Sequence, residues 1–148
     1  KFEYGFLGYF KKDFKSPFEG YDMGGDGLSG YQLYGVETIT LRGYGSSTLT
    51  PADGGNLYSK YTMELRYPLV LSPSANIYVL SFAEAGNAWT EFSDFSPFSL
   101  KRSAGIGIRL FLPMLGLLGF DYGYGFDKIP GYNDAGGWQP NFVLGQQL

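Results

Sequence analysis

The chain has 148 residues, including 13 Phe, 13 Tyr, 2 Trp and 23 Gly, and its formal net charge is −3. It contains no Cys and no His, which excludes disulfides, Cys- or His-based metal sites and Ser-His catalytic triads. A negative chain is a poor partner for nucleic acid, and no run of about 18 apolar residues is present to form a transmembrane helix. We therefore expect no enzyme activity, no cofactor, no metal and no nucleic-acid partner.

The chain opens with aromatic residues at alternate positions. Phe2, Tyr4 and Phe6 predict a strand that continues toward Phe10. Because no signal peptide precedes this strand, we interpret the chain as a piece of a longer protein. A Gly-rich loop follows from about residue 11 to residue 56, with short strand-like pieces between residues 31 and 41. A loop of this length is usually functional. We expect it to have little core of its own and to need an anchor.

Strict alternation returns after the loop and predicts five further strands. One begins at Leu57 and stops at Pro68 and the Ser72-Pro73-Ser74 cluster; the others span Asn76–Trp89, Ser103–Leu112, Leu118–Phe126 and Asn141–Leu148. One face of these strands is apolar and is expected to contact lipid; it includes Leu57, Met63, Leu65, Ile106, Ile108, Leu110, Phe120 and Tyr122. The opposite face carries Gly, Asp, Glu and Arg, which predicts a polar interior.

The spacing of turns and loops favours an all-β, antiparallel transmembrane β-barrel. Short turns at residues 72–75 and 113–116 alternate with long loops at 11–56, 90–100 and 128–141, as in outer-membrane barrels. A mean hydropathy of −0.12 fits this class, because alternating faces average to neutral. A soluble sandwich or a lipocalin-like barrel is the alternative. About six strands are too few to close in lipid, so the missing strands must come from preceding residues or from other chains.

Four motifs resemble the BamA family of outer-membrane insertases, in the family's order. Gly24-Gly25-Asp26-Gly27 and Leu41-Arg42-Gly43-Tyr44 resemble its sixth extracellular loop, and the runs Phe82–Trp89 and Ser103–Gly107 resemble the strands that follow it. The resemblance covers essentially the whole chain and favours a Bacteroidetes-type member. It implies that residues 1–148 are the C-terminal portion of the barrel domain, about the last six strands of a sixteen-stranded barrel, with the loop folded into the lumen.

The resemblance also implies roles for individual residues. Arg42 would reach Glu64 and Glu84 on the inner wall, and the alternation independently places both carboxylates on the polar face. Gly43 would let the loop backbone pass close to the wall, with Tyr44 completing the signature. The end of the chain, Phe142, Leu144, Gly145 and Leu148, resembles the C-terminal signal of outer-membrane barrels, although the family usually ends on an aromatic residue.

These features imply a protein of the bacterial outer membrane that folds client β-barrel proteins and inserts them by lateral opening of a seam. Its expected partners are those clients, accessory assembly lipoproteins and the lipid bilayer. A related translocator that secretes a partner protein, a passive channel and an outer-membrane hydrolase are the alternatives; known hydrolases of this kind rely on His, which this chain lacks.

Overall fold

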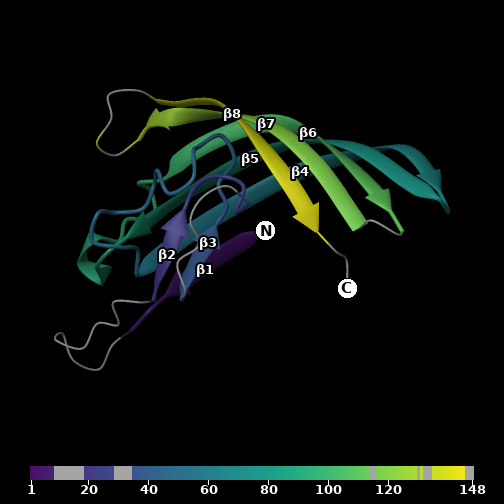
Figure 1. Ribbon diagram of the computed structural model, residues 1–148. Coiled ribbons are helices and arrows are strands. Elements are labelled where there is room, and N and C mark those ends of the chain that lie inside the picture. Colours follow the sequence, from purple (N-terminus) through teal and green to yellow (C-terminus); the bar gives the residue numbers. More distant parts are fainter. Residues whose placement is uncertain (9–18, 29–34, 114–115, 130, 132–134, 146–148) are drawn as a thin grey trace.

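The computed structural model describes residues 1–8, 19–28, 35–113, 116–129, 131 and 135–145 (Figure 1). One antiparallel sheet has the strand order β1-β4-β5-β6-β7-β8. Its strands are β1 (Phe2–Phe6), β4 (Leu57–Ser72), β5 (Ala75–Trp89), β6 (Lys101–Leu112), β7 (Gly116–Lys128) and β8 (Ala135–Gly145). A short 3-10 turn, η2 (Phe92–Asp94), follows β5. Within the described ranges, no helix is long and apolar enough to cross a membrane.

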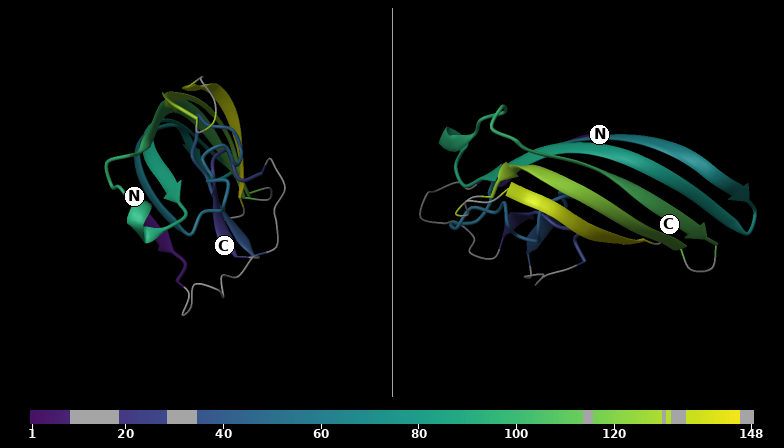
Figure 2. Two further views of the ribbon diagram at one scale, coloured as in Figure 1. Left: turned by 90° about the vertical axis from the view of Figure 1, so that its left-hand side faces the viewer. Right: turned by 90° about the horizontal axis from the view of Figure 1, so that it is seen from above.

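The long loop contains a second, smaller sheet. Strands β2 (Gly20–Met23) and β3 (Val36–Ile39) pair in parallel. The large sheet is curved, and the loop with β2 and β3 lies on its concave side (Figures 1 and 2). We call this concave side the inner face. The large sheet is open in the described residues, with β1 at one edge and β8 at the other.

Strand β4 runs through Pro68 and ends at Ser72, where the predicted turn begins. The prediction counted Pro68 among the residues that end the strand, because proline has no N–H to donate to a ladder. The structure instead shifts the register between Pro68 and Val70 and continues pairing with β5 as far as Ser72. The N–H of Thr62 points toward β1, so an N–H at position 68, six residues later, would point the same way and away from β5. The ladder with β5 therefore does not need a donor at Pro68, and the strand survives the proline.

Strand β8 begins at Ala135, whereas the prediction placed residues 128–141 in a loop. The prediction rested partly on Gly136 and Gly137, which are typical of loops. Gly137 has a positive φ of 68° and follows a register shift in the pairing with β7, where glycine is favoured. At the other end of the chain, β1 stops at Phe6, and the predicted continuation to Phe10 lies partly outside the described residues.

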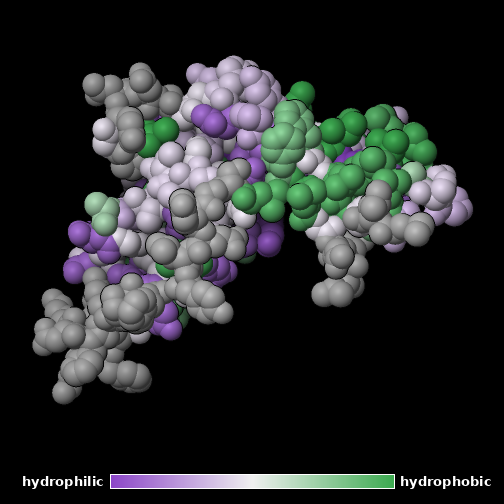
Figure 3. Space-filling view, viewed as in Figure 1, coloured by the Kyte–Doolittle hydropathy of each residue, from purple (hydrophilic) through white to green (hydrophobic). Residues whose placement is uncertain are grey.

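Alternation along the strands separates an exposed apolar outer face from the inner face. Leu65, Met63 and Ile106 are 74%, 75% and 66% exposed. Ile108, Phe120 and Tyr122 are also exposed, and Leu110 is half-buried. Figure 3 shows hydrophobic residues gathered over the right-hand part of the view, away from the long loop.

Leu57 differs from the predicted lipid-facing set, because it is buried with only 5% of its surface exposed. In the register it lies between Phe6 of β1 and Trp89 of β5. The Phe6 ring contacts Phe92, and the Trp89 ring contacts Phe95. Aromatic side chains from the segment after β5 therefore cover this end of the outer face, and Leu57 is shielded from solvent or lipid.

The outer face provides the first prediction. If it contacts lipid, Ile108→Arg should destabilise the full-length protein in bilayers by about 2–4 kcal/mol, the cost of Arg at the midplane on a lipid-facing barrel position. Equilibrium unfolding in lipid vesicles measures this difference. Ser74→Arg, in the exposed turn between β4 and β5, is the control and should cost about 0–1 kcal/mol. Equal stability of the Ile108→Arg variant and the parent would contradict the assignment of the face.

Candidate functional site

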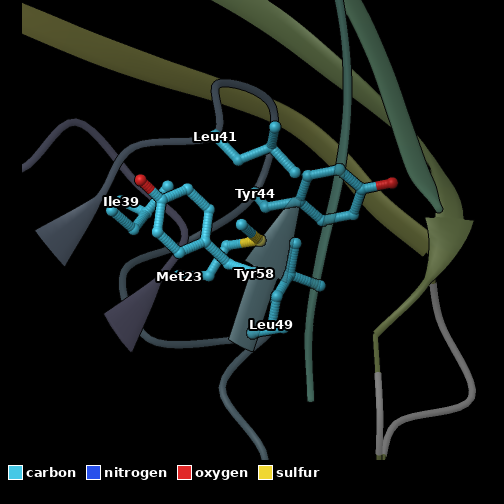
Figure 4. Close-up of a cluster of buried hydrophobic side chains, with 7 residues drawn as sticks. Met23, Ile39, Leu41, Tyr44, Leu49 and Tyr58 are labelled. Carbon is cyan, nitrogen blue, oxygen red and sulfur yellow. The ribbon is translucent and has the colours of Figure 1, made fainter. Parts of the chain in front are cut away.

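The long loop has a buried core of its own, contrary to the prediction that it has little. Met23, Ile39, Leu41, Tyr44 and Leu49 pack with two residues of the inner face. Those two are Tyr58 of β4 and Ala88 of β5, and the labelled side chains converge in Figure 4. Sequence pattern alone does not reveal this core, because its members are scattered among glycines and follow no periodic pattern. The core packs the loop against β4 and β5 independently of the charged contacts.

Arg42 follows this core and faces three carboxylates from three strands. Its Nη2 lies 2.7 Å from Glu84 Oε1 of β5 and 2.8 Å from Glu64 Oε1 of β4. Its Nη1 donates to Asp121 Oδ2 of β7 at 3.1 Å. The backbone N–H of Arg42 also donates to Glu84 Oε2 at 2.9 Å. The structure thus brings Arg42 together with both predicted carboxylates and adds Asp121.

The Arg42 guanidinium stays charged although the residue is only 9% exposed. Burial by itself lowers its pKa, but the hydrogen bond and charge of Glu84, together with the charge of Asp121, raise the pKa above its ordinary value. The ring of Phe82 lies beneath the guanidinium, 3.8 Å from Cζ to the ring centroid, and adds a cation–π contact. A buried charge with this many partners avoids the large penalty of an unpaired one.

A second arginine and a lysine extend the charge cluster. Arg109 of β6 holds Asp121 with two hydrogen bonds, from Nη1 to Oδ1 at 2.6 Å and from Nη2 to Oδ2 at 2.7 Å. Lys60 Nζ lies 3.5 Å from Glu84 Oε1. Positive and negative groups alternate across the inner face, so each carboxylate has a cationic partner. Among the described residues, no group of three or more potential metal ligands is arranged to hold a metal ion.

Sequence reasoning did not include Asp121, Arg109 or Lys60 in the cluster. Alternation places all three on the polar face, which is the signal that was available. Alternation does not tell which polar residues of different strands lie side by side, because that depends on the register. The register pairs Asp121 with Gly107, two residues before Arg109, and the long arginine side chain spans the diagonal.

Gly43 passes close to the wall, and wall glycines make the room. Its φ is +87°, a conformation that favours glycine. A Cβ on Gly125 of β7 would lie 2.4 Å from the Gly43 carbonyl oxygen, and a Cβ on Gly136 of β8 would lie 2.6 Å from the same atom. A Cβ on Gly123 would lie 2.9 Å from the Gly43 nitrogen. The glycines of β7 and β8 therefore form a shallow seat for the loop backbone.

Tyr44 fills the remainder of this seat and is completely buried. Its hydroxyl donates to the Arg102 carbonyl oxygen at 2.8 Å and accepts from the Asp127 N–H at 3.1 Å. Burial raises the pKa of the phenol, so it remains a neutral donor. The signature thus uses Arg42 for the carboxylates, Gly43 for the close approach and Tyr44 for the backbone of β6 and β7.

The predicted seam residues lie away from the charge cluster. Phe142 and Leu144 are 54% and 63% exposed on the outer face of β8, and Gly145 is its last residue. Leu148 lies outside the described residues. Besides the close approach at Gly136, a hydrogen bond joins β8 to the signature: the Gly43 N–H donates to Asn141 Oδ1 at 3.4 Å.

The cluster borders a polar cavity of about 560 Å³ on the inner face. Its lining includes Arg42, Glu64, Glu84 and Asp121 together with Arg66 and Lys60. Such a surface can hold water and position a polypeptide loop.

The charge cluster generates a prediction about loop stability. Arg42→Ala should expose the loop to protease while the strands stay paired, since removal of one partner of a buried pair costs about 3–5 kcal/mol. Arg42→Lys should rescue only part of the resistance, because an ammonium has no planar fork. Limited proteolysis of the full-length protein measures the effect. Arg102→Ala is the control, because its pair with Asp127 is exposed and contributes little.

A double-mutant cycle separates the two glutamates. Coupling of Arg42 should be larger to Glu84 than to Glu64. The Glu84 side chain is 2% exposed, whereas that of Glu64 is 17% exposed and is shared with Arg66 at 2.7 Å. Coupling indistinguishable from zero for both pairs would mean that Arg42 does not anchor the loop.

The glycine seat generates a third prediction. Gly125→Ala should loosen the loop as Arg42→Ala does, because its methyl group would displace the Gly43 carbonyl and the Tyr44 ring. The same proteolysis assay applies. Gly8→Ala is the matched control, since nothing lies within 4 Å of the added Cβ. Similar protease resistance in the two alanine variants would show that the close approach is not needed.

Comparison with known proteins agrees with this geometry at the level of the family. The model of the Omp85 superfamily domain matches residues 1–148, the full length of the chain. No curated protein and no solved structure matches. The curved antiparallel sheet, with a loop seated on its inner face, fits this assignment. The chain therefore belongs to the Omp85 superfamily, which includes insertases and translocators of the outer membrane.

Proposed function

We propose that this chain is part of a BamA-type insertase that folds client β-barrel proteins and inserts them into the bacterial outer membrane. In this proposal the described sheet supplies about the last six strands of a sixteen-stranded barrel of the Bacteroidetes type. Clients and accessory assembly lipoproteins are its partners, and the lipid bilayer surrounds its outer face.

The observation that carries the proposal is the set of contacts made by Arg42. One guanidinium joins the loop to β4, β5 and β7 at distances of 2.7 to 3.1 Å. The loop is thereby fixed to the strands that lead toward the last strand. This supports a function in which the inner wall stays rigid while another part of the barrel moves. No nucleotide and no covalent step enters such a mechanism.

The moving part in this proposal is the seam at β8. In the described sheet β8 has no neighbouring strand on its outward side, and pairing of another strand there is strand addition, in which main-chain hydrogen bonds supply the affinity. Gly145 at the end of β8 has no side chain to pack, which weakens pairing there. A weak closure lets client strands compete for the edge.

The translocator remains the second candidate, because the polar cavity beside Arg42 is lined by charged side chains that tolerate a passing hydrated chain. A passive channel is less well supported, since the loop packs on the inner face through a buried core and occupies the concave side. Both candidates predict that the seam plays no part in the activity, which separates them from the insertase.

A disulfide across the seam tests the proposal. Leu144→Cys combined with a cysteine on the first barrel strand of the full-length protein should block insertion of an outer-membrane barrel into proteoliposomes. Reduction of the disulfide should restore it. Insertion is measured by the shift in gel mobility between folded and unfolded barrels.

The matched control joins β8 to its permanent neighbour. Tyr124→Cys with Trp138→Cys links directly opposite residues of β7 and β8, whose rings lie 5.2 Å apart, and should leave insertion intact. Full insertion with the seam closed would remove lateral opening and would favour the translocator.

A further inference from the structure

The loop makes a contact with the backbone of β8 that the charge cluster does not require. Asp26 Oδ2 accepts the backbone N–H of Phe142 at 3.2 Å. Its other oxygen, Oδ1, accepts the N–H of Leu28 at 2.9 Å, which holds the carboxylate in a local turn. A carboxylate fixed in this way is a strong acceptor for a backbone donor.

The registers decide which way the Phe142 N–H points. Successive N–H groups along an antiparallel strand point alternately to the two neighbouring strands. The backbone N–H of Thr62 in β4 donates to the Lys1 carbonyl at 2.8 Å and so points toward β1. The N–H of its neighbour Tyr61 therefore points to the other side, toward β5. Following the registers through β5, β6 and β7 directs the N–H of Asn141 toward β7 and that of Phe142 away from it. Asp26 therefore covers a donor at the outward edge of β8.

The neighbouring outward position has no donor at all. Two residues before Phe142 the same edge carries Pro140, which has no N–H. Proline is compatible with a strand at such a place because the ladder with β7 does not use it. Two consecutive outward positions thus offer no donor while Asp26 is in place. The next outward residue is Leu144, near the end of the strand.

We propose that Asp26 determines where strand pairing on β8 begins. With Asp26 bound, an incoming strand pairs only from Leu144 onward; when Asp26 withdraws, pairing extends to Phe142. Asp26 is a positioning residue, because it acts through the backbone of β8. This inference rests on the proposed function, in which client strands add to this edge.

The position of Asp26 links the cap to the anchor. Gly25, its neighbour, forms a bridge with Leu41, the residue before Arg42. Asn141, the residue before Phe142, accepts from Gly43. Asp26, which caps the Phe142 N–H, and the Arg42-Gly43-Tyr44 signature are therefore adjacent in the loop. They form hydrogen bonds with adjacent residues of β8, Phe142 and Asn141. A movement that releases the signature from β8 also releases the edge.

Amide hydrogen exchange tests the cap without any client. In the full-length protein in lipid nanodiscs, Asp26→Ala should speed exchange of the Phe142 amide at least tenfold as followed by NMR. Asp26→Asn keeps an amide oxygen as acceptor and should give an intermediate rate. Asp53→Ala, at an exposed loop aspartate, is the matched control and should leave the rate unchanged. Unchanged exchange in Asp26→Ala overturns the cap.

Strand pairing is tested with a defined probe, a photoreactive synthetic peptide of residues 135–148. Asp26→Ala should raise its cross-linking to β8 several-fold. The gain should vanish when Phe142→Pro removes the donor, since proline at this edge leaves the ladder with β7 intact. Faster exchange with unchanged cross-linking, or an equal gain in both backgrounds, overturns the role in pairing. Failure of the seam-disulfide experiment bears on the proposed function instead, because the amide measurement involves neither seam nor client.

Discussion

The structure depends on one guanidinium placed among three carboxylates. Glu64, Glu84 and Asp121 come from different strands, and their mutual repulsion on a buried surface would be costly without a cation between them. Arg42 supplies that cation from a loop rather than from the sheet. The loop and the wall therefore stabilise each other: Arg42 gives each carboxylate a further cationic partner beside Arg66, Lys60 and Arg109 of the wall, and the carboxylates compensate the buried charge of Arg42. This mutual dependence explains how a Gly-rich loop keeps one conformation.

Packing restricts the position of the loop that the ion pairs of Arg42 then stabilise. The apolar cluster around Met23 and Leu41 seats the loop, and the glycines of β7 and β8 let its backbone come within van der Waals contact of the wall. Electrostatic attraction is less directional than packing, so carboxylates alone would tolerate several positions of an arginine. The close approach at the wall glycines and the hydrogen bonds of the Tyr44 hydroxyl restrict Arg42 to one position. The anchor is thus a combination of charge, shape and backbone hydrogen bonding.

The same loop touches β8, the strand at the sheet edge. Exposed edges invite pairing with other chains, and proteins commonly protect them with proline or by covering them with a loop. Here Pro140 and the Asp26 carboxylate provide both kinds of protection over neighbouring positions. An edge that is covered in part and released in part suits a strand whose function is controlled pairing. One loop thus carries both the Arg42 anchor and the Asp26 contact with the edge strand, so movement of the loop affects both.

Local sequence patterns were sufficient to predict an all-β fold and the side-chain direction along its strands. Alternation with a period of two assigns Ile108 to the outer face and Glu64 and Glu84 to the inner face, because side-chain direction is a local property of a strand. Only the tertiary structure decided that Asp121 and Arg109 join them, that Leu57 is buried and that β8 begins at Ala135. These features depend on register, on a proline at an unpaired edge and on contacts between residues far apart in the chain, none of which is encoded in local periodicity.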